Sequence, residues 1–384
     1  MLFHIAQDEL LRALQHVSRA ADANSPIPSL SGIYVKADSR QLLFIAGSDR
    51  MTIQYRVSIE PGSCRCEVVR SGNVIIPANY VLEWVRKLPP GIVTVDTNQD
   101  LVVTIRSDAA VCRISGMNGA PYTPITRPSS AAASFLISNE ALKRAIQQVA
   151  FAVSASETRP VLTGVFCKPS GTMLRLTASD SIRLATGQAE IRKERSNESA
   201  DNALPQPFLV SGKALYDISK LIPSTTEMTR IFVAPEHVTV QTGPLEVSLT
   251  QLHGTYPAVD RLIPSAFVTE MVVSTAGLQS AIERMMLMSG EGHLVRIDSA
   301  DAKTVRLASR TSGVGDVCEL LPVQHLSGEA VAVCFNGKYM SDIVRTVGSE
   351  HVAIRFAGKW SPLLLQPADC SASQYLLTPI RTHA

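Results

Sequence analysis

Hydrophobic and polar positions follow two periods along this chain, one typical of helices and one typical of strands. Leu10, Ala13, Leu14 and Val17 recur at i, i+3, i+4 and i+7, which predicts an amphipathic helix with one buried stripe; the segment 79–88 has the same spacing. Runs rich in β-branched residues, such as GIYVKA, QLLFIAG, IVTVDT and HVTVQT, predict strands between the helices. The pattern therefore predicts an α+β fold in which helices cover one face of antiparallel sheets.

The same unit occurs three times. FHIAQDELLRALQHV from Phe3 matches FLISNEALKRAIQQV from Phe135 at an offset of 132 residues, and VVSTAGLQSAIERM is a fainter third copy. The second half of each unit repeats as IIPANYVLEWVRKLP, FLVSGKALYDISKLIP and VCFNGKYMSDIVRTVG. Pro/Ser-rich links then predict domains at 1–127, 128–264 and 265–384. Duplication into a structural array without a common function is the alternative.

Composition narrows the class of protein. A chain of 384 residues is long enough for two or three cores. It has no apolar run of membrane-spanning length and no signal-peptide pattern at its start, so we expect a cytoplasmic protein without a membrane partner. The seven cysteines are scattered without zinc-site spacing, which predicts structural thiols and no metal or cofactor. A net charge of +2 is too small to indicate nucleic-acid binding by itself.

Basic residues recur on the helix faces opposite the apolar stripes. They are Arg12 and Arg19 on the first helix, then Arg86, Lys87, Lys143, Arg144, Lys213, Lys220, Arg284, Lys338 and Arg345. Asp342 can pair with Arg345 three residues on. The repeated sign predicts sequence-independent contact with the phosphates of duplex DNA, although charged surface helices are the simpler alternative. Few aromatic residues lie among these bases, so single-strand stacking is not indicated.

Repeated units with helices on one side favour closure into a ring. Two chains joined head to tail would supply six units and twelve inner helices. Neighbouring helix axes about 10 Å apart would lie on a circle about 38 Å across. Removing one helix diameter of about 10 Å leaves a hole of about 28 Å. A DNA duplex would pass through it loosely and could slide.

Motifs for catalysis are missing from the sequence. SGKAL at 211–215 lacks the spacing of a phosphate-binding loop, and neither G-x-S-x-G nor H-E-x-x-H occurs. Asp49 and Asp180 recur in S-D steps without a partner acid or base, which indicates turn residues. We therefore predict no catalytic residue and no enzyme. A DNA-modifying or hydrolytic enzyme built on duplicated β-rich domains is the remote alternative.

Five segments, in order along the whole chain, are similar to the bacterial DNA polymerase III subunit beta (sliding clamp) family. They are IPSLSGIYV, TASDSIRLA at 177–185, GTYPAVDRLIP at 254–264, CFNGKYM and the C-terminal YLLTPIRTHA. The resemblance implies three DNA-clamp domains per chain and a head-to-tail ring homodimer around double-stranded DNA. It also implies that DNA polymerase, the clamp loader and repair proteins bind the ring through short clamp-binding motifs.

By position, the resemblance implies a hydrophobic pocket for those motifs. Its residues would be Leu162, Ser179, Ser181, Ile182, Arg183, Leu184, Pro257, Arg261, Leu262, Pro362, Leu376, Thr378 and Ile380. Aliphatic walls would anchor apolar side chains, and Arg183 or Arg261 would hold a carbonyl or carboxylate. Ordinary core packing is the alternative for each leucine.

The resemblance also places the remaining contacts. Asn24 stands in a loop that approaches DNA in the family. The dimer would join the third domain of one chain to the first of the other, through Leu287 and Met288 and the strand holding Cys112 and Ile114. Ile182 and Thr378 depart from the family pattern, which usually has His and a larger apolar residue. A specialised paralogue with restricted partners, or a decoy or resistance copy, is therefore the alternative to a replicative clamp.

Overall fold

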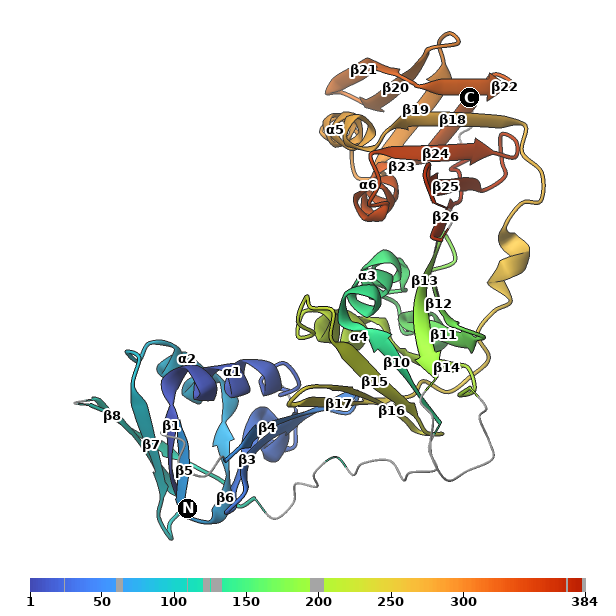
Figure 1. Cartoon of the computed structure of the whole chain (residues 1–384). Coiled ribbons are helices and arrows are strands. Elements are labelled where there is room, and N and C mark those ends of the chain that lie inside the picture. The colour runs from blue at the N-terminus through green and yellow to red at the C-terminus, as the bar shows by residue number, and fades with distance from the viewer. Residues whose placement is uncertain are drawn as a thin grey trace. The chain divides into compact units, whose positions relative to one another are not determined.

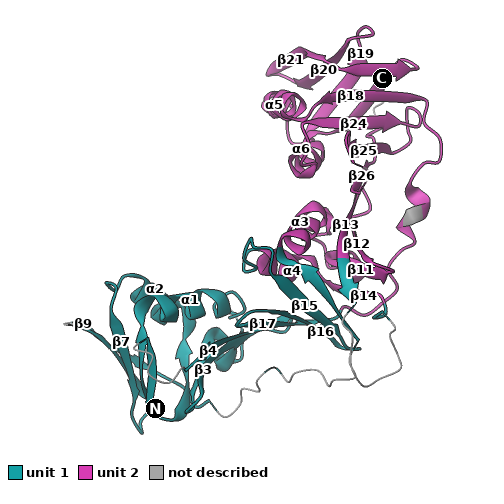
Figure 2. Ribbon diagram, in the orientation of Figure 1, with its two compact units in different colours: residues 1–139, 191–206, 220–251 teal, residues 140–190, 207–219, 252–384 magenta. Residues whose placement is uncertain are grey.

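The chain folds into alternating helices and antiparallel strands (Figure 1). This computed structural model describes residues 1–23, 25–59, 65–108, 110–119, 125, 133–193, 204–370 and 372–381. Two compact units divide the chain, unit 1 with residues 1–139, 191–206 and 220–251, and unit 2 with residues 140–190, 207–219 and 252–384 (Figure 2).

Unit 1 contains two antiparallel sheets. The first has the order β5 (Cys66–Arg70), β1 (Leu2–Ala6), β7 (Ile92–Thr97), β8 (Val102–Ser107) and β9 (Ala110–Ser115). The second runs through β6 (Gly72–Pro77), β2 (Gly32–Ala37), β3 (Gln41–Gly47), β4 (Met51–Ser58), β17 (Leu245–Thr250), β16 (His237–Thr242), β15 (Met228–Val233) and β10 (Ser134–Ser138). The end of β13 (Arg183–Lys193) pairs with β10.

Helices α1 (Gln7–Val17) and α2 (Ala78–Arg86) belong to this unit, with the short 3-10 helix η1 (Pro28–Ser31). The predicted stripe of α1 is confirmed, because Leu10, Ala13, Leu14 and Val17 are all buried. They pack against β3, β4 and α2. Helix α2 ends two residues before the predicted boundary at 88.

Unit 2 also contains two antiparallel sheets. The larger runs through β14 (Phe208–Ser211), β11 (Gly164–Ser170), β12 (Met173–Ser179), β13, β26 (Gln374–Leu377), β25 (Leu363–Pro367), β24 (His351–Phe356), β18 (Thr269–Ser274) and β22 (His325–Gly328). The smaller has the order β21 (Gly315–Pro322), β20 (Thr304–Thr311), β19 (Leu294–Ser299) and β23 (Ala332–Asn336).

Four helices accompany these sheets: α3 (Asn139–Val149), α4 (Gly212–Ser219), α5 (Thr275–Met286) and α6 (Gly337–Thr346), with 3-10 helices η2 (Ala150–Ala152), η3 (Pro160–Thr163) and η4 (Val259–Leu262). Side chains fix where two of them begin: the Ser274 hydroxyl accepts from the Gly277 N–H, and the Asn336 amide oxygen accepts from the Tyr339 N–H. Among the described residues, no helix is long and apolar enough to cross a membrane.

One rule governs how strands from different repeats pair. The first half of each repeat ends in β4, β13 or β21, and the second half ends in β9, β17 or β26. Strand β4 pairs with β17, where Tyr55 faces Leu245, and β13 pairs with β26, where Leu184 faces Leu376. Each junction thus joins the last strand of a first half to the last strand of a second half. Within the described ranges, β9 and β21 each have one strand partner, β8 and β20.

Candidate functional site

The turn between β12 and β13 is held by its own side chains. The Asp180 carboxylate accepts the N–H groups of Ile182 at 3.0 Å and Arg183 at 2.9 Å, and the Ser179 hydroxyl oxygen accepts the Ser181 N–H at 3.2 Å. Ser181 adopts a left-handed backbone conformation with φ of 77°. Asp180 is therefore the turn residue that its S-D step predicted.

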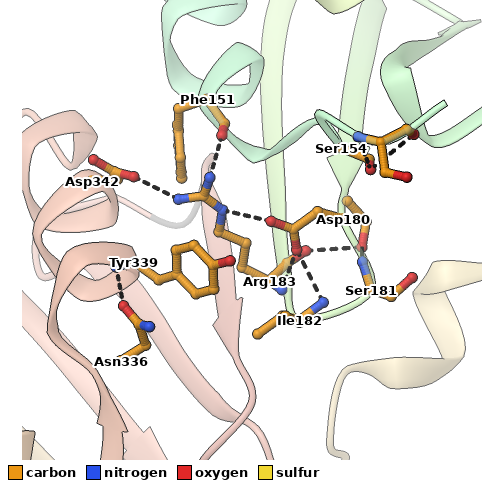
Figure 3. Close-up of polar contacts among 11 residues, drawn as sticks. Phe151, Ser154, Asp180, Ser181, Ile182, Arg183, Asn336, Tyr339 and Asp342 are labelled. Atoms are coloured by element: carbon orange, nitrogen blue, oxygen red, sulfur yellow. Dashed lines mark hydrogen bonds and ion pairs between the residues drawn. The ribbon is translucent and has the colours of Figure 1, made fainter. Parts of the chain in front are cut away.

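Arg183 connects this turn to α6 (Figure 3). Its Nε donates to Asp180 at 3.0 Å, Nη1 to Asp342 at 2.7 Å and Nη2 to the Phe151 carbonyl at 2.7 Å. The guanidinium also lies 4.4 Å from the ring centre of Tyr339 and 5.2 Å from that of Phe151. All three nitrogens thus have acceptors inside the protein, and only 10% of the side chain is exposed.

The expected pairing within α6 is wrong. Asp342 accepts from Arg183, 159 residues away in the sequence, rather than from Arg345. Arg345 donates instead to Glu283 on α5, at 3.0 Å. The intrahelical rule does hold on α2, where Arg86 donates to Glu83 at 2.5 Å.

Three of the expected pocket residues lie in one apolar cluster beside this turn. Leu162, Leu184 and Leu376 are buried together, and the cluster also holds Leu209, Tyr256, Val259 and Leu364, with Val161, Phe166, Leu252, Ile263 and Phe267 packed against it. The rings of Phe166 and Tyr256 stack with their centres 5.3 Å apart. Burial raises the pKa of the Tyr256 hydroxyl, so this group stays neutral at physiological pH.

The other expected pocket residues surround the turn or follow η4. Ile182, Leu262, Pro257, Arg261, Ser181 and Thr378 are exposed, Pro362 and Ile380 are half-buried, and Ser179 is buried. The Thr378 N–H donates to the Ile182 carbonyl at 2.9 Å, and the Ile380 N–H donates to the Cys334 carbonyl at 2.8 Å. The first bond holds the segment after β26 beside the turn, and the second ties the same segment to β23. The exposed aliphatic side chains of Ile182 and Leu262 thus lie in the same unit as the buried apolar cluster. This arrangement is suited to binding the apolar side chains of a short peptide.

The basic residues predicted to face DNA are exposed, apart from half-buried Lys143, on helices or directly after them. Some have acidic partners on the surface, as Arg12 has Glu9 at 3.6 Å and Arg284 has Glu319 at 2.8 Å. Such exposed pairs hold a side chain only weakly. Asn24 lies outside the described residues.

Residues predicted for a dimer contact lie on the edge strand β9 of unit 1 and after helix α5 of unit 2. In unit 1, Cys112 and Ile114 on β9 are half-buried. Val111 on the same strand, which pairs with β8, is exposed. In unit 2, Leu287 follows α5 and is 82% exposed, Met288 is half-buried, and Leu320 on β21 is 60% exposed. The sequence reasoning missed Val111 and Leu320, although their alternation in edge strands could have indicated them.

Three repeats, each with two helices and antiparallel sheets joined edge to edge, define the class of three-domain DNA-clamp folds. Models of the DNA polymerase III beta subunit match the chain throughout: the N-terminal domain over residues 1–126, the central domain over 136–258 and the C-terminal domain over 260–381. The chain therefore belongs to the bacterial DNA polymerase III beta subunit, or sliding clamp, family.

Individual relatives agree with this assignment. A beta sliding clamp of Halalkalibacterium halodurans is 30% identical over 388 aligned residues, covering 100% of both chains. The crystal structure of the DNA polymerase sliding clamp from Bacillus subtilis matches with a TM-score of 0.92 at 28% identity, again over 100% of both chains. That of the DNA polymerase III beta chain from Streptococcus pneumoniae matches with a TM-score of 0.91 at 25% identity, over 99% of this chain and 100% of that one.

Proposed function

We propose that two copies of this chain close head to tail into a ring around double-stranded DNA, and that the ring tethers DNA polymerase, the clamp loader and repair proteins. The observation that carries the proposal is the strand-pairing rule, which uses β4 with β17 and β13 with β26 and leaves β9 and β21 as the remaining pair. Membership of the sliding clamp family supports the same function.

Ring closure would repeat the junctions already present in the chain. An edge strand offers backbone N–H and C=O groups to another strand, and β9 of one copy would pair with β21 of the other. Val111 on β9, and Leu320 and Leu287 near β21, would become buried there. The same contact made twice by a two-fold axis closes the ring and pairs the β9 and β21 edges of both copies.

DNA would be held by charge without base reading. The exposed bases on the helices, among them Arg12, Arg86, Lys213 and Lys338, would face phosphates along the duplex. Partners would bind through the apolar cluster beside the β12–β13 turn, with Ile182 and Leu262 as exposed anchors and Arg261 available for a carbonyl or carboxylate. We expect no turnover by the chain itself, and action in the cytoplasm, where bacterial DNA lies.

A fluorescent peptide that carries a clamp-binding motif tests the partner site. We expect saturable binding that Ile182→Glu and Leu262→Glu each weaken about tenfold or more, because a charge would enter the apolar site. Val69→Glu, which changes an equally exposed aliphatic residue on β5, is the matched control and should bind like wild type. Equal binding by all four proteins, or none by wild type, would refute the peptide site.

DNA topology tests the ring. Protein loaded onto nicked circular DNA by a bacterial clamp loader with ATP should stay bound through gel filtration at high salt. Because high salt screens electrostatic contacts, a protein held only by charge would dissociate under these conditions. Cutting the circle once should release it within minutes by sliding off the ends. Equal retention on circular and linear DNA would contradict encirclement. Support of processive synthesis would then distinguish a replicative clamp from a paralogue with restricted partners, the alternative that Ile182 and Thr378 favour.

A further inference from the structure

Unit 2 contains a cavity of about 740 Å³, which adjoins the β12–β13 turn at Asp342 and Phe151, the two lining residues that Arg183 contacts. Its lining residues come from α3, η2, α4 and α6 and from the positions just after η2 and α6. The volume lies within the range of small-molecule sites, about 300–1,000 Å³. Neither the peptide site nor the ring contact described above includes this cavity.

Basic side chains from three different helices line it. Arg144 comes from α3, Lys213 from α4 and Arg345 from α6, and all three are exposed. The acid in the lining is Asp342, whose carboxylate is bound by Arg183 at 2.7 Å. Cations gathered around a concave surface attract an anion, and guanidinium and ammonium groups suit a phosphate in particular.

Aromatic and apolar groups form the rest of the surface. Tyr216 on α4 lines the cavity and is 45% exposed. Phe151, Val153 and Val347 add apolar walls, and Gln147 offers both a donor and an acceptor. Tyr216 stands three residues after Lys213 on α4, whereas Phe151 and Arg345 join the same lining only through the fold.

We propose that this cavity binds one nucleotide unit, with the phosphate held by Arg144, Lys213 and Arg345 and the base against Tyr216. A phosphate joined to a flat, hydrogen-bonding ring matches each part of the lining. Stacking on an aromatic ring accepts any of the four bases, so the site would show little sequence preference. The inference rests on the proposed function, since DNA held at the helices would bring nucleotides to this face.

The nucleotide can come from two sources, a free nucleotide or an unpaired residue of a DNA strand. Calorimetric titration with deoxyadenosine monophosphate tests the first. Fluorescence anisotropy with a labelled duplex that carries a single-stranded overhang, compared with the blunt duplex of the same length, tests the second. Each measurement uses the full-length protein, its Tyr216→Ala and Tyr216→Phe variants, and the Arg144→Gln/Lys213→Gln double variant.

Tyr80→Ala is the matched control, since Tyr80 is an exposed tyrosine on α2 outside the cavity. Tyr216→Ala should weaken binding of the nucleotide, the overhang DNA or both about fivefold or more, as removal of one stacked base does elsewhere. Tyr216→Phe should bind like wild type, Tyr80→Ala should stay within about twofold, and blunt duplex should be insensitive to Tyr216→Ala. The glutamine variant should weaken the same ligand.

The ligand whose binding depends on Tyr216 identifies the source. If Tyr216→Ala changes neither ligand, or changes blunt and overhang DNA equally, the site is refuted. Binding of the clamp-motif peptide, measured in parallel, separates the two proposals: peptide binding without an effect of Tyr216→Ala removes only this site. If instead the peptide and DNA fail to bind, the titration with the free nucleotide still decides whether the cavity takes it.

Discussion

Replacing Arg183 by methionine removes one guanidinium while keeping most of the stem that packs under Tyr339. Asp342 and the Phe151 carbonyl then lose the guanidinium as a donor, and Asp180 loses it too but keeps the N–H groups of residues 182 and 183. The Asp180 side chain is 12% exposed and that of Asp342 30%, so water replaces the lost contacts only in part. Leaving buried charge unpaired costs about 3–5 kcal/mol, and the exposure of Asp342 favours the lower end, about 3 kcal/mol.

Differential scanning calorimetry measures this change directly. About 3 kcal/mol corresponds to a fall of about 6–12 °C in the melting temperature of a unit of this size. Arg345→Met is the matched control, because its ion pair with Glu283 is 59% and 50% exposed and contributes little. Asp342→Asn and the double variant complete a cycle whose coupling free energy we expect at about 0.5–3 kcal/mol.

The same variant should also weaken the clamp-motif peptide, since the turn that carries Ile182 loses its anchor. Each guanidinium nitrogen of Arg183 already donates within the protein and only 10% of the side chain is exposed, so we expect this loss to come from the changed position of the turn. An equal fall in melting temperature for Arg183→Met and Arg345→Met would refute the structural role of Arg183. Additive effects of Arg183→Met and Asp342→Asn would show that the two residues do not interact in solution.

Three further predictions concern two thiols and one strained glycine. Burial raises the pKa of the Cys66 thiol to about 11. Because the thiolate is the form that reacts, peptide mass mapping after alkylation at pH 8 should find Cys66 unlabelled, and labelling should increase as the pH approaches 11. Rapid labelling of Cys66 at pH 8 would refute its burial. Cys318 and Cys370 are both exposed, but only Cys318 lies on β21. As the protein concentration rises and dimers form, Cys318 should become protected from alkylation while Cys370 does not. Equal labelling of Cys318 at every protein concentration would count against the β21 contact. Gly328→Ala should lower the melting temperature by several degrees, because φ is 105° and a Cβ would lie 2.0 Å from the Val268 carbonyl oxygen. The control is Gly171→Ala, with φ of 59° and open space around the position, which should lower the melting temperature less. Equal decreases for the two variants would refute the clash at Gly328.

Periodic features of the fold were predictable from the sequence because they are local. The stripe on α1 follows from helix geometry alone, and the buried side chains of Leu10 and Leu14 confirm it. Many of the β-branched runs became strands with nearly the expected bounds, such as β2 and β16. Internal repetition extended these local predictions to three copies, because similar sequences fold alike.

Contacts between distant segments were not predictable in the same way. The i, i+3 rule favoured Arg345 as the partner of Asp342, but the buried guanidinium of Arg183 is the better donor once the fold brings it close. Tyr256 and Val259 belong to the apolar cluster although they stand in or beside a short 3-10 helix with no periodic signal. Tyr216 and Arg144 likewise line one cavity only because the fold brings residues of α3 and α4 to it.

Sedimentation equilibrium of the pure protein tests the head-to-tail ring most directly. The account predicts one species at micromolar concentration with twice the 41.4 kDa mass of the chain, which Leu320→Arg on β21 converts to single chains while Val69→Arg on β5 does not. A wild-type particle of 41.4 kDa, or a dimer that Leu320→Arg leaves intact, would contradict ring closure through β9 and β21.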